Sequence, residues 1–87
     1  MTCHQRQIVR AILATLVQMD GGVLAEALLH GAVRQLTRPP ASLSEFEAGL
    51  RYCDDQHWVN GVLGRLQVRK WCLTENGEAA HRDLDPL

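Results

Sequence analysis

Residues 69–80 change from the pattern of a strand to the pattern of a helix within a single pair of residues. The segment reads Arg-Lys-Trp-Cys-Leu-Thr-Glu-Asn-Gly-Glu-Ala-Ala, and in an extended chain Trp71 and Leu73 would share one face. Thr74 is a suitable N-cap, and two glutamates follow it near the positive end of the helix dipole. A strand that leads directly into a helix restricts the fold strongly, because both elements must bury their apolar sides in one core.

Three amphipathic helical segments are predicted upstream, over residues 5–19, 23–36 and 43–57. The first is stopped by Asp-Gly-Gly at 20–22, and the second by the two prolines within residues 37–41. The expected apolar stripes are Ile8, Ile12, Leu13, Leu16 and Val17 in the first helix; Leu24, Leu28, Ala32 and Leu36, with Val33 beside them, in the second; and Leu43, Phe46, Leu50 and Cys53 in the third. A capping box of Ser42 and Glu45 begins the third helix.

Residues 58–73 predict a short β-ribbon. Trp58-Val59 has the pattern of a strand, Asn60-Gly61 and Gly64 are turn or bulge signals, and residues 68–73 form the returning strand. A closing helix is expected over residues 75–84. The whole chain, 1–87, is thus predicted to be a single domain, mainly α with a small β-ribbon (α+β), in the order α-α-α-β-β-α.

This order resembles the winged-helix (winged helix-turn-helix) domain of bacterial or phage type over nearly the whole chain. The basic strand that leads into Leu73-Thr74-x-x-Gly77 carries the resemblance, as does the run from Leu50 to Val59. The sequence departs from the pattern at the long, proline-rich connection between Leu36 and Ser42 and at His57, where a glycine often ends the helix. No particular subfamily is indicated. The resemblance implies a DNA-binding or transcription-regulator function, with the first and closing helices as candidate surfaces of a homodimer.

The bulk composition excludes several classes of protein. Hydrophobic residues make up 46% of the chain, which disfavours disorder, and no apolar run is long enough to cross a bilayer. An odd count of three cysteines and the absence of a signal-peptide pattern predict a cytoplasmic protein without disulfides. No phosphate-binding glycine loop, nucleophile elbow or paired-carboxylate motif is present, so we expect neither an enzyme nor a cofactor.

Charge is distributed unevenly along the chain, whose net charge is -1. Residues 58–73 carry two Arg and one Lys with no acid, whereas residues 41–57 carry four acidic residues against Arg51. A recognition helix lies between rows of phosphates, where Glu45 and Glu47 would be unfavourable. The basic ribbon is therefore the better predicted contact with a nucleic acid.

Duplex DNA is the first predicted partner. In that hypothesis the ribbon holds the phosphate backbone, the third helix supplies the side chains nearest the bases, and two arginines at the end of the second helix and in the connection after it add phosphate contacts. The candidate residues are, in that order, Arg65, Arg69 and Lys70; Arg51 and Tyr52; and Arg34 and Arg38.

A basic protein is the alternative partner. The acidic third helix, with Asp54-Asp55 near its end, would dock such a partner or mimic the charge of a nucleic acid toward it. Arg and Lys in the ribbon would then have the simpler role of preventing edge-to-edge strand pairing.

Metal binding and base stacking are weaker alternatives. Cys53 and His57 have the spacing of two ligands on one helix face, and Cys72 or His81 would have to complete such a site; Cys3-His4 is a second pair. No CxxC or HxxxH motif supports either pair, so no metal site is predicted. Trp58 and Trp71 are expected to pack within the domain, with stacking on bases as the functional alternative.

Overall fold

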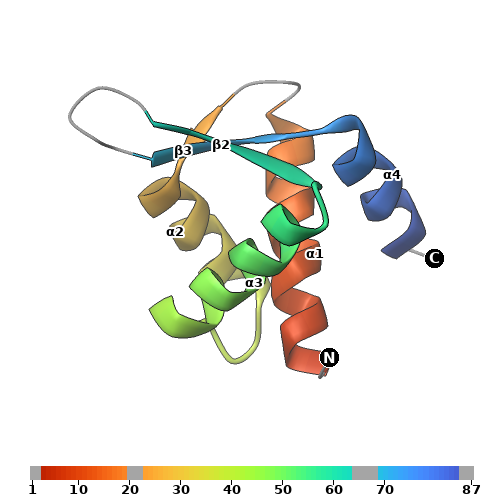
Figure 1. The fold of residues 1–87 in the computed structure, drawn as a ribbon. Coiled ribbons are helices and arrows are strands. Elements are labelled where there is room, and N and C mark those ends of the chain that lie inside the picture. The colour runs from red at the N-terminus through yellow and green to blue at the C-terminus, as the bar shows by residue number, and fades with distance from the viewer. Residues whose placement is uncertain (1–2, 20–22, 64–68, 85–87) are drawn as a thin grey trace.

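Four helices and a three-stranded sheet make up the described part of the chain, residues 3–19, 23–63 and 69–84 of a computed structural model (Figure 1). The helices are α1 (Cys3–Gln18), α2 (Glu26–Leu36), α3 (Leu43–Asp55) and α4 (Glu75–Leu84). The strands are β1 (Leu24–Ala25), β2 (Val59–Leu63) and β3 (Arg69–Leu73). The mainly helical α+β prediction is confirmed, although a strand before the second helix was not expected.

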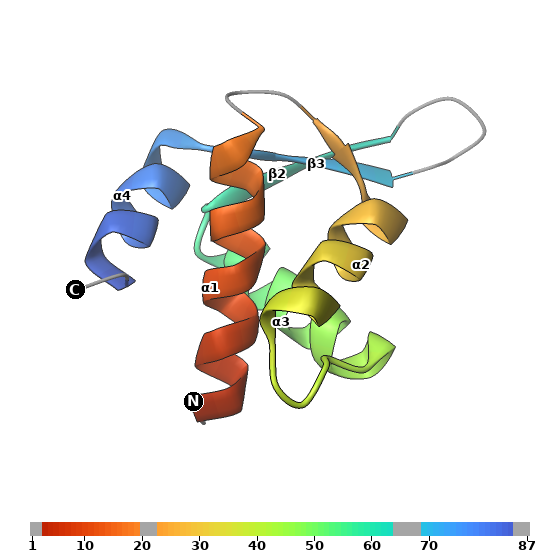
Figure 2. The same ribbon diagram turned by 180° about the vertical axis from the view of Figure 1, so that it is seen from behind.

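The core is built around α1, which lies between α4 and the α2–α3 pair when the molecule is seen from behind (Figure 2). Its expected stripe is buried except for half-buried Val17. Gly49 of α3 faces Ile8, since a Cβ atom on Gly49 would lie only 2.8 Å from Ile8 Cγ2. This close approach joins α1 to α3 along a mostly aliphatic interface, and its burial supplies the main driving force for folding.

The second helix differs from the prediction in its start and in its buried face. It begins at Glu26, not at residue 23, and the residues that it buries are Leu29 and Val33. Leu28 and Leu36 are instead 65% and 58% exposed. Both stripes have the four-residue spacing of a helix, so spacing alone does not choose between them. The choice is made by β1, whose pairing with β3 fixes where α2 begins.

The third helix begins as predicted. Ser42 Oγ accepts a hydrogen bond from the Glu45 backbone N–H at 3.2 Å, and Glu45 Oε1 accepts one from the Ser42 N–H at 3.0 Å. Phe46, Leu50 and Cys53 are buried as expected, but Leu43, the first residue of the helix, is 57% exposed.

The third helix ends at Asp55, two residues earlier than predicted. His57 follows with φ 62°, the left-handed conformation that favours glycine. This is the position where the resemblance led us to expect a glycine, and the histidine adopts the left-handed conformation that a glycine would favour.

The sheet has the order β1-β3-β2, with both pairs antiparallel. Gly61 of β2 and Leu24 of β1 lie opposite Trp71 of β3. A Cβ atom on Gly61 would lie 3.0 Å from the Trp71 ring, so the missing side chain makes room for the indole. Trp58 precedes β2 and is not part of it, and the expected turn residue Gly64 lies outside the described residues.

Candidate nucleic-acid interface

The two described basic residues of the ribbon lie on opposite faces of β3. Arg69 shares a face with Trp71, and its guanidinium carbon lies 5.9 Å from the centre of the Trp71 ring. Lys70 is exposed on the other face, between Ala25 of β1 and Val62 of β2. Arg65 lies outside the described residues. The basic cluster of the sequence therefore does not form one continuous surface in β3.

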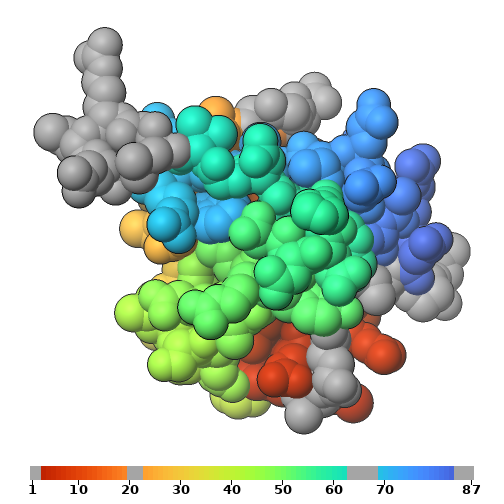
Figure 3. All heavy atoms as spheres, in the orientation of Figure 1, coloured from red at the N-terminus to blue at the C-terminus, as the bar shows by residue number. Residues whose placement is uncertain are grey.

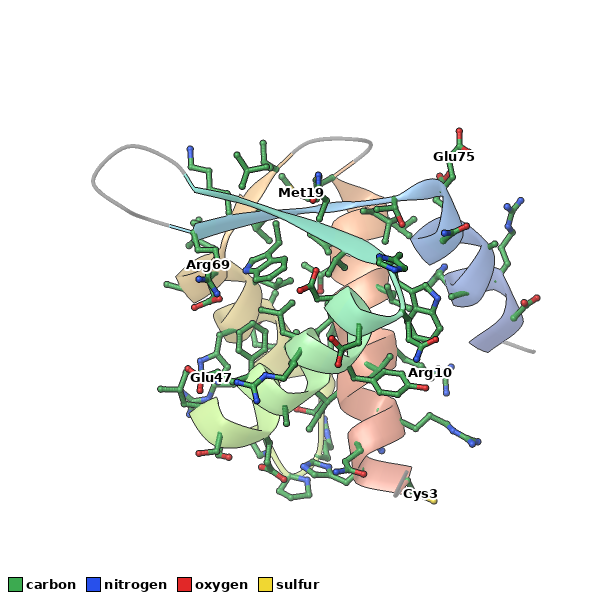
Figure 4. All side chains as sticks on the ribbon, viewed as in Figure 1. Cys3, Arg10, Met19, Glu47, Arg69 and Glu75 are labelled. Carbon is green, nitrogen blue, oxygen red and sulfur yellow. The ribbon has the colours of Figure 1, made fainter. Side chains whose placement is uncertain are left out.

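Arg69 opens onto a cleft between α2, α3 and β3, with a volume of about 280 Å³. Figure 4 shows Arg69 and Glu47 on the same side of the molecule. The cleft is lined by Glu26, Glu47, Leu50, Arg51, Asp54, Arg69 and Trp71. Two of the predicted DNA contacts, Arg51 and Arg69, are thus brought together, but three carboxylates accompany them. This cleft is called the α3–β3 cleft below.

Trp71 is a structural element of this cleft. It is 5% exposed, and its Nε1–H donates a hydrogen bond to Glu26 Oε1 at 3.1 Å. A buried indole cannot stack on a base, so the stacking alternative is wrong for Trp71. Trp58 is half-buried and meets Tyr52 edge to face, with ring centres 5.6 Å apart. Both tryptophans pack within the domain, as expected.

Tyr52 lies apart from Arg51, although the two are neighbours in sequence. It borders a groove of about 550 Å³ between α1 and α3, together with Glu45 and Gly49. Adjacent residues on a helix differ in direction by about 100°, which explains why one faces β3 and the other faces α1. The predicted pair of base-reading side chains is therefore divided between two hollows.

Arg34 and Arg38 are exposed at a distance from the ribbon. Arg34 is in the last turn of α2, and Arg38 is in the connection that follows, where its backbone N–H donates to Gln7 Oε1 at 3.3 Å. That connection lies at the end of the molecule away from the sheet (Figures 1 and 2). The structure does not bring these residues together with Arg51 and Arg69.

Four exposed carboxylates lie on α3, which forms the middle of the face seen in Figure 3. Glu45 pairs with His4, whose Nε2 lies 3.1 Å from Glu45 Oε2. Hydrogen bonds from Ser42 and the nearby His4 lower the pKa of the Glu45 carboxyl. Glu47, Asp54 and Asp55 are exposed and have no ion-pair partner among the described residues. The acidity inferred from the sequence is therefore presented to solvent.

The cysteines and histidines are dispersed. Burial raises the pKa of the Cys53 thiol to about 12, which keeps it protonated and disfavours the thiolate that zinc requires. His57 is exposed beyond the end of α3. Cys72 Sγ lies 3.6 Å from the Asn60 carbonyl oxygen. Within residues 3–19, 23–63 and 69–84, no three His, Cys, Asp or Glu side chains are close enough to hold a metal ion.

Glu26 lines the α3–β3 cleft but was not among the site residues predicted from the sequence. Its partner Trp71 is 45 positions away, and no local periodicity indicates such a contact.

None of the described helices combines the length and the apolar character needed to cross a bilayer.

The arrangement of three helices, an antiparallel ribbon and a closing helix is a winged-helix fold. A solved structure supports this assignment: the circadian clock associated protein Pex from Anabaena aligns with a TM-score of 0.71 and 17% sequence identity. The alignment covers 92% of this chain and 72% of that chain. At this identity the likeness establishes the fold alone. No family model and no curated protein matches the sequence.

Proposed function

We propose that this winged-helix domain is a non-enzymatic, regulator-type protein that binds duplex DNA. The observation that carries the proposal is that Arg51 of α3 and Arg69 of β3 line one cleft. In a winged helix, α3 and the ribbon are the two elements that can follow a groove and its phosphate backbone together. Arg69 would bind a phosphate, and Arg65 and Lys70 are further predicted contacts of the wing.

The acidic residues of α3 oppose a close contact between this helix and the duplex. Glu47 and Asp54 of α3, together with Glu26 of α2, lie in the cleft with the two arginines, so the cleft carries more negative than positive side chains. Carboxylates beside phosphates are unfavourable, which limits how closely α3 can approach the duplex. The wing is therefore expected to supply most of the affinity, and binding should be weakly sequence-dependent and strongly salt-dependent.

A low-salt binding assay tests the proposal directly. Fluorescence anisotropy with a random duplex at ~50 mM salt should give saturable binding that weakens steeply as salt increases. Arg69→Glu should reduce the affinity, whereas Arg82→Glu on α4 makes the same change in charge away from the cleft and should reduce it much less. Absence of wild-type binding at this salt concentration would remove the proposal.

A basic protein partner is the second candidate function. It is favoured by Glu47, Asp54 and Asp55, which are exposed and make no ion pair among the described residues. Unneutralised charges of one sign can steer a partner of the opposite sign. In this case the wild type should not retain DNA, and a captured basic protein should be released by Asp54→Lys/Asp55→Lys but not by Glu75→Lys on α4.

A further inference from the structure

One indole ring contacts both an arginine and a carboxylate in the α3–β3 cleft. The face of Trp71 is covered by Arg69, whose Cζ lies 5.9 Å from the ring centre. The Nε1–H of the same ring donates to Glu26 Oε1 at 3.1 Å. Trp71 itself is fixed by burial and by its position over Gly61. The ring is therefore a fixed element that contacts two side chains of opposite charge.

The two contacts differ in what they leave available. An arginine over an aromatic face is held through its π system, so its N–H donors remain free to bind an anion bidentately. A carboxylate that accepts an indole N–H has one of its oxygens occupied. Arg69 is exposed and forms no ion pair with any described residue, although Glu26 lines the same cleft.

Without the indole N–H, Glu26 would be a half-buried carboxylate with an arginine nearby. An Arg–carboxylate pair is a strong and often bidentate interaction, and it would occupy the N–H donors that a phosphate needs. The Trp71–Glu26 hydrogen bond competes with that pair, because it occupies Oε1, one of the two oxygens that a bidentate pair would need.

We propose that Trp71 is a positioning residue that keeps Arg69 available to a phosphate group, by holding the guanidinium over its ring and by engaging Glu26. This inference rests on the proposed DNA-binding function and identifies a residue that acts through Arg69. It predicts that removing the indole N–H weakens binding even though no positive charge is lost, and that removing the Glu26 carboxylate restores it.

A double-mutant cycle tests the prediction. Trp71→Phe keeps an aromatic ring but removes the donor, and should lower the affinity for a random duplex roughly 3- to 10-fold, with the salt slope smaller by about 0.9, as for one lost phosphate contact. Adding Glu26→Gln should restore affinity and slope. Adding Glu47→Gln removes the same charge from the same cleft, and should raise affinity only as much as it does in the wild type.

Two outcomes of the cycle would overturn the inference. One is that Trp71→Phe and Trp71→Phe/Glu26→Gln lose affinity equally, which would indicate a purely structural role. The other is that Glu47→Gln restores binding as well as Glu26→Gln, which would indicate general electrostatics. If circular dichroism shows that the Trp71→Phe variant is unfolded, benzothienylalanine at position 71 takes the place of phenylalanine in the cycle. This residue keeps the bicyclic shape of the indole but lacks the N–H.

A readout without DNA separates this inference from the proposed function. The Arg69 Nε–Hε resonance in ¹⁵N NMR spectra should shift to the position of a carboxylate-paired arginine in Trp71→Phe and return in Trp71→Phe/Glu26→Gln. The same resonance in both variants would refute the positioning role even if DNA binds. The predicted shifts in a protein that does not bind DNA would refute the proposed function alone.

Discussion

Gly77 of α4 lies so close to the Trp58 backbone carbonyl that a Cβ atom at position 77 would overlap the carbonyl oxygen. The same Cβ atom would lie 2.6 Å from Leu73 Cδ1. Thr74 reinforces this junction, since its backbone N–H donates to the Trp58 oxygen at 3.0 Å. The Leu-Thr-x-x-Gly sequence thus joins the start of α4 to the chain between α3 and β2, and its glycine is required by close approach of the backbone.

Gly77→Ala should destabilise the protein by about 2–4 kcal/mol, because the clash is with backbone, which cannot move aside as a side chain can. Gly31→Ala is the matched control: apart from its two chain neighbours and the backbone of α2, no described residue has an atom within 4 Å of the added Cβ, and the substitution should stabilise α2 by about 0.5–1 kcal/mol. Urea unfolding followed by circular dichroism measures both. Equal effects of the two substitutions would contradict this account of Gly77.

Thr74→Val should lower the free energy of unfolding by about 1–2 kcal/mol, as expected for a lost N-cap. Thr74 Oγ1 accepts a hydrogen bond from the Gly77 N–H at 3.0 Å and donates one to the His57 carbonyl oxygen at 2.6 Å. Valine has a similar shape and can make neither bond. Thr74→Ser keeps the hydroxyl and should retain most of the stability in thermal unfolding; an equal loss in both variants would contradict a dominant role of the two hydroxyl hydrogen bonds.

His57→Gly should stabilise the protein by about 0.5–1 kcal/mol, because a left-handed conformation is unfavourable for a residue with a Cβ atom. The neighbouring Gln56 has φ -84° and ψ -2°, which any residue adopts, so Gln56→Gly should instead be neutral or destabilising. The melting temperatures of the two variants should therefore move apart. A fall in both would mean that the His57 side chain makes a compensating contribution.

The stability of the protein should decrease at alkaline pH because of Cys53. The pKa of this thiol is raised by burial from the ordinary value of 9.0 to about 12. Between these values the unfolded state loses the thiol proton and the folded state keeps it. The contribution of the thiol to the free energy of unfolding is therefore fully present below pH 9 and is lost as the pH rises above it. The expected slope is about 1.4 kcal/mol per pH unit.

Cys53→Ala provides the control for this slope. The substitution lowers the stability at every pH by leaving a cavity, but it should also remove the contribution of the thiol to the decrease between pH 9 and 10.5. Urea unfolding at several pH values compares the two proteins. Parallel curves for wild type and Cys53→Ala would contradict a buried, neutral thiol at this position.

Several elements could be predicted because their signals are local. The N-cap at Thr74, the capping box of Ser42 and Glu45, and the stop at the two prolines each depend on neighbouring residues only. Such signals give the order of the helices and the ribbon, and in this case that order was sufficient to indicate a winged helix. The acidity of α3 followed from composition, since exposed helix positions tolerate charge.

The remaining features depend on residues far apart in the chain. Leu24–Ala25 becomes a strand only because β3 offers it a partner, and this pairing moves the start of α2 and selects Leu29 over Leu28 for the core.

The candidate site also combines features set by neighbouring residues with features set by residues far apart in the chain. The sequence by itself determined which charges the wing and α3 carry, because composition and local periodicity assign them to elements. Strand alternation already places Arg69 and Lys70 on opposite faces of β3. Only the tertiary structure decided that Arg51 and Arg69 share a cleft with Glu26. The physical reason is that side-chain direction depends on strand register and helix phase, and both are fixed by long-range pairing and packing.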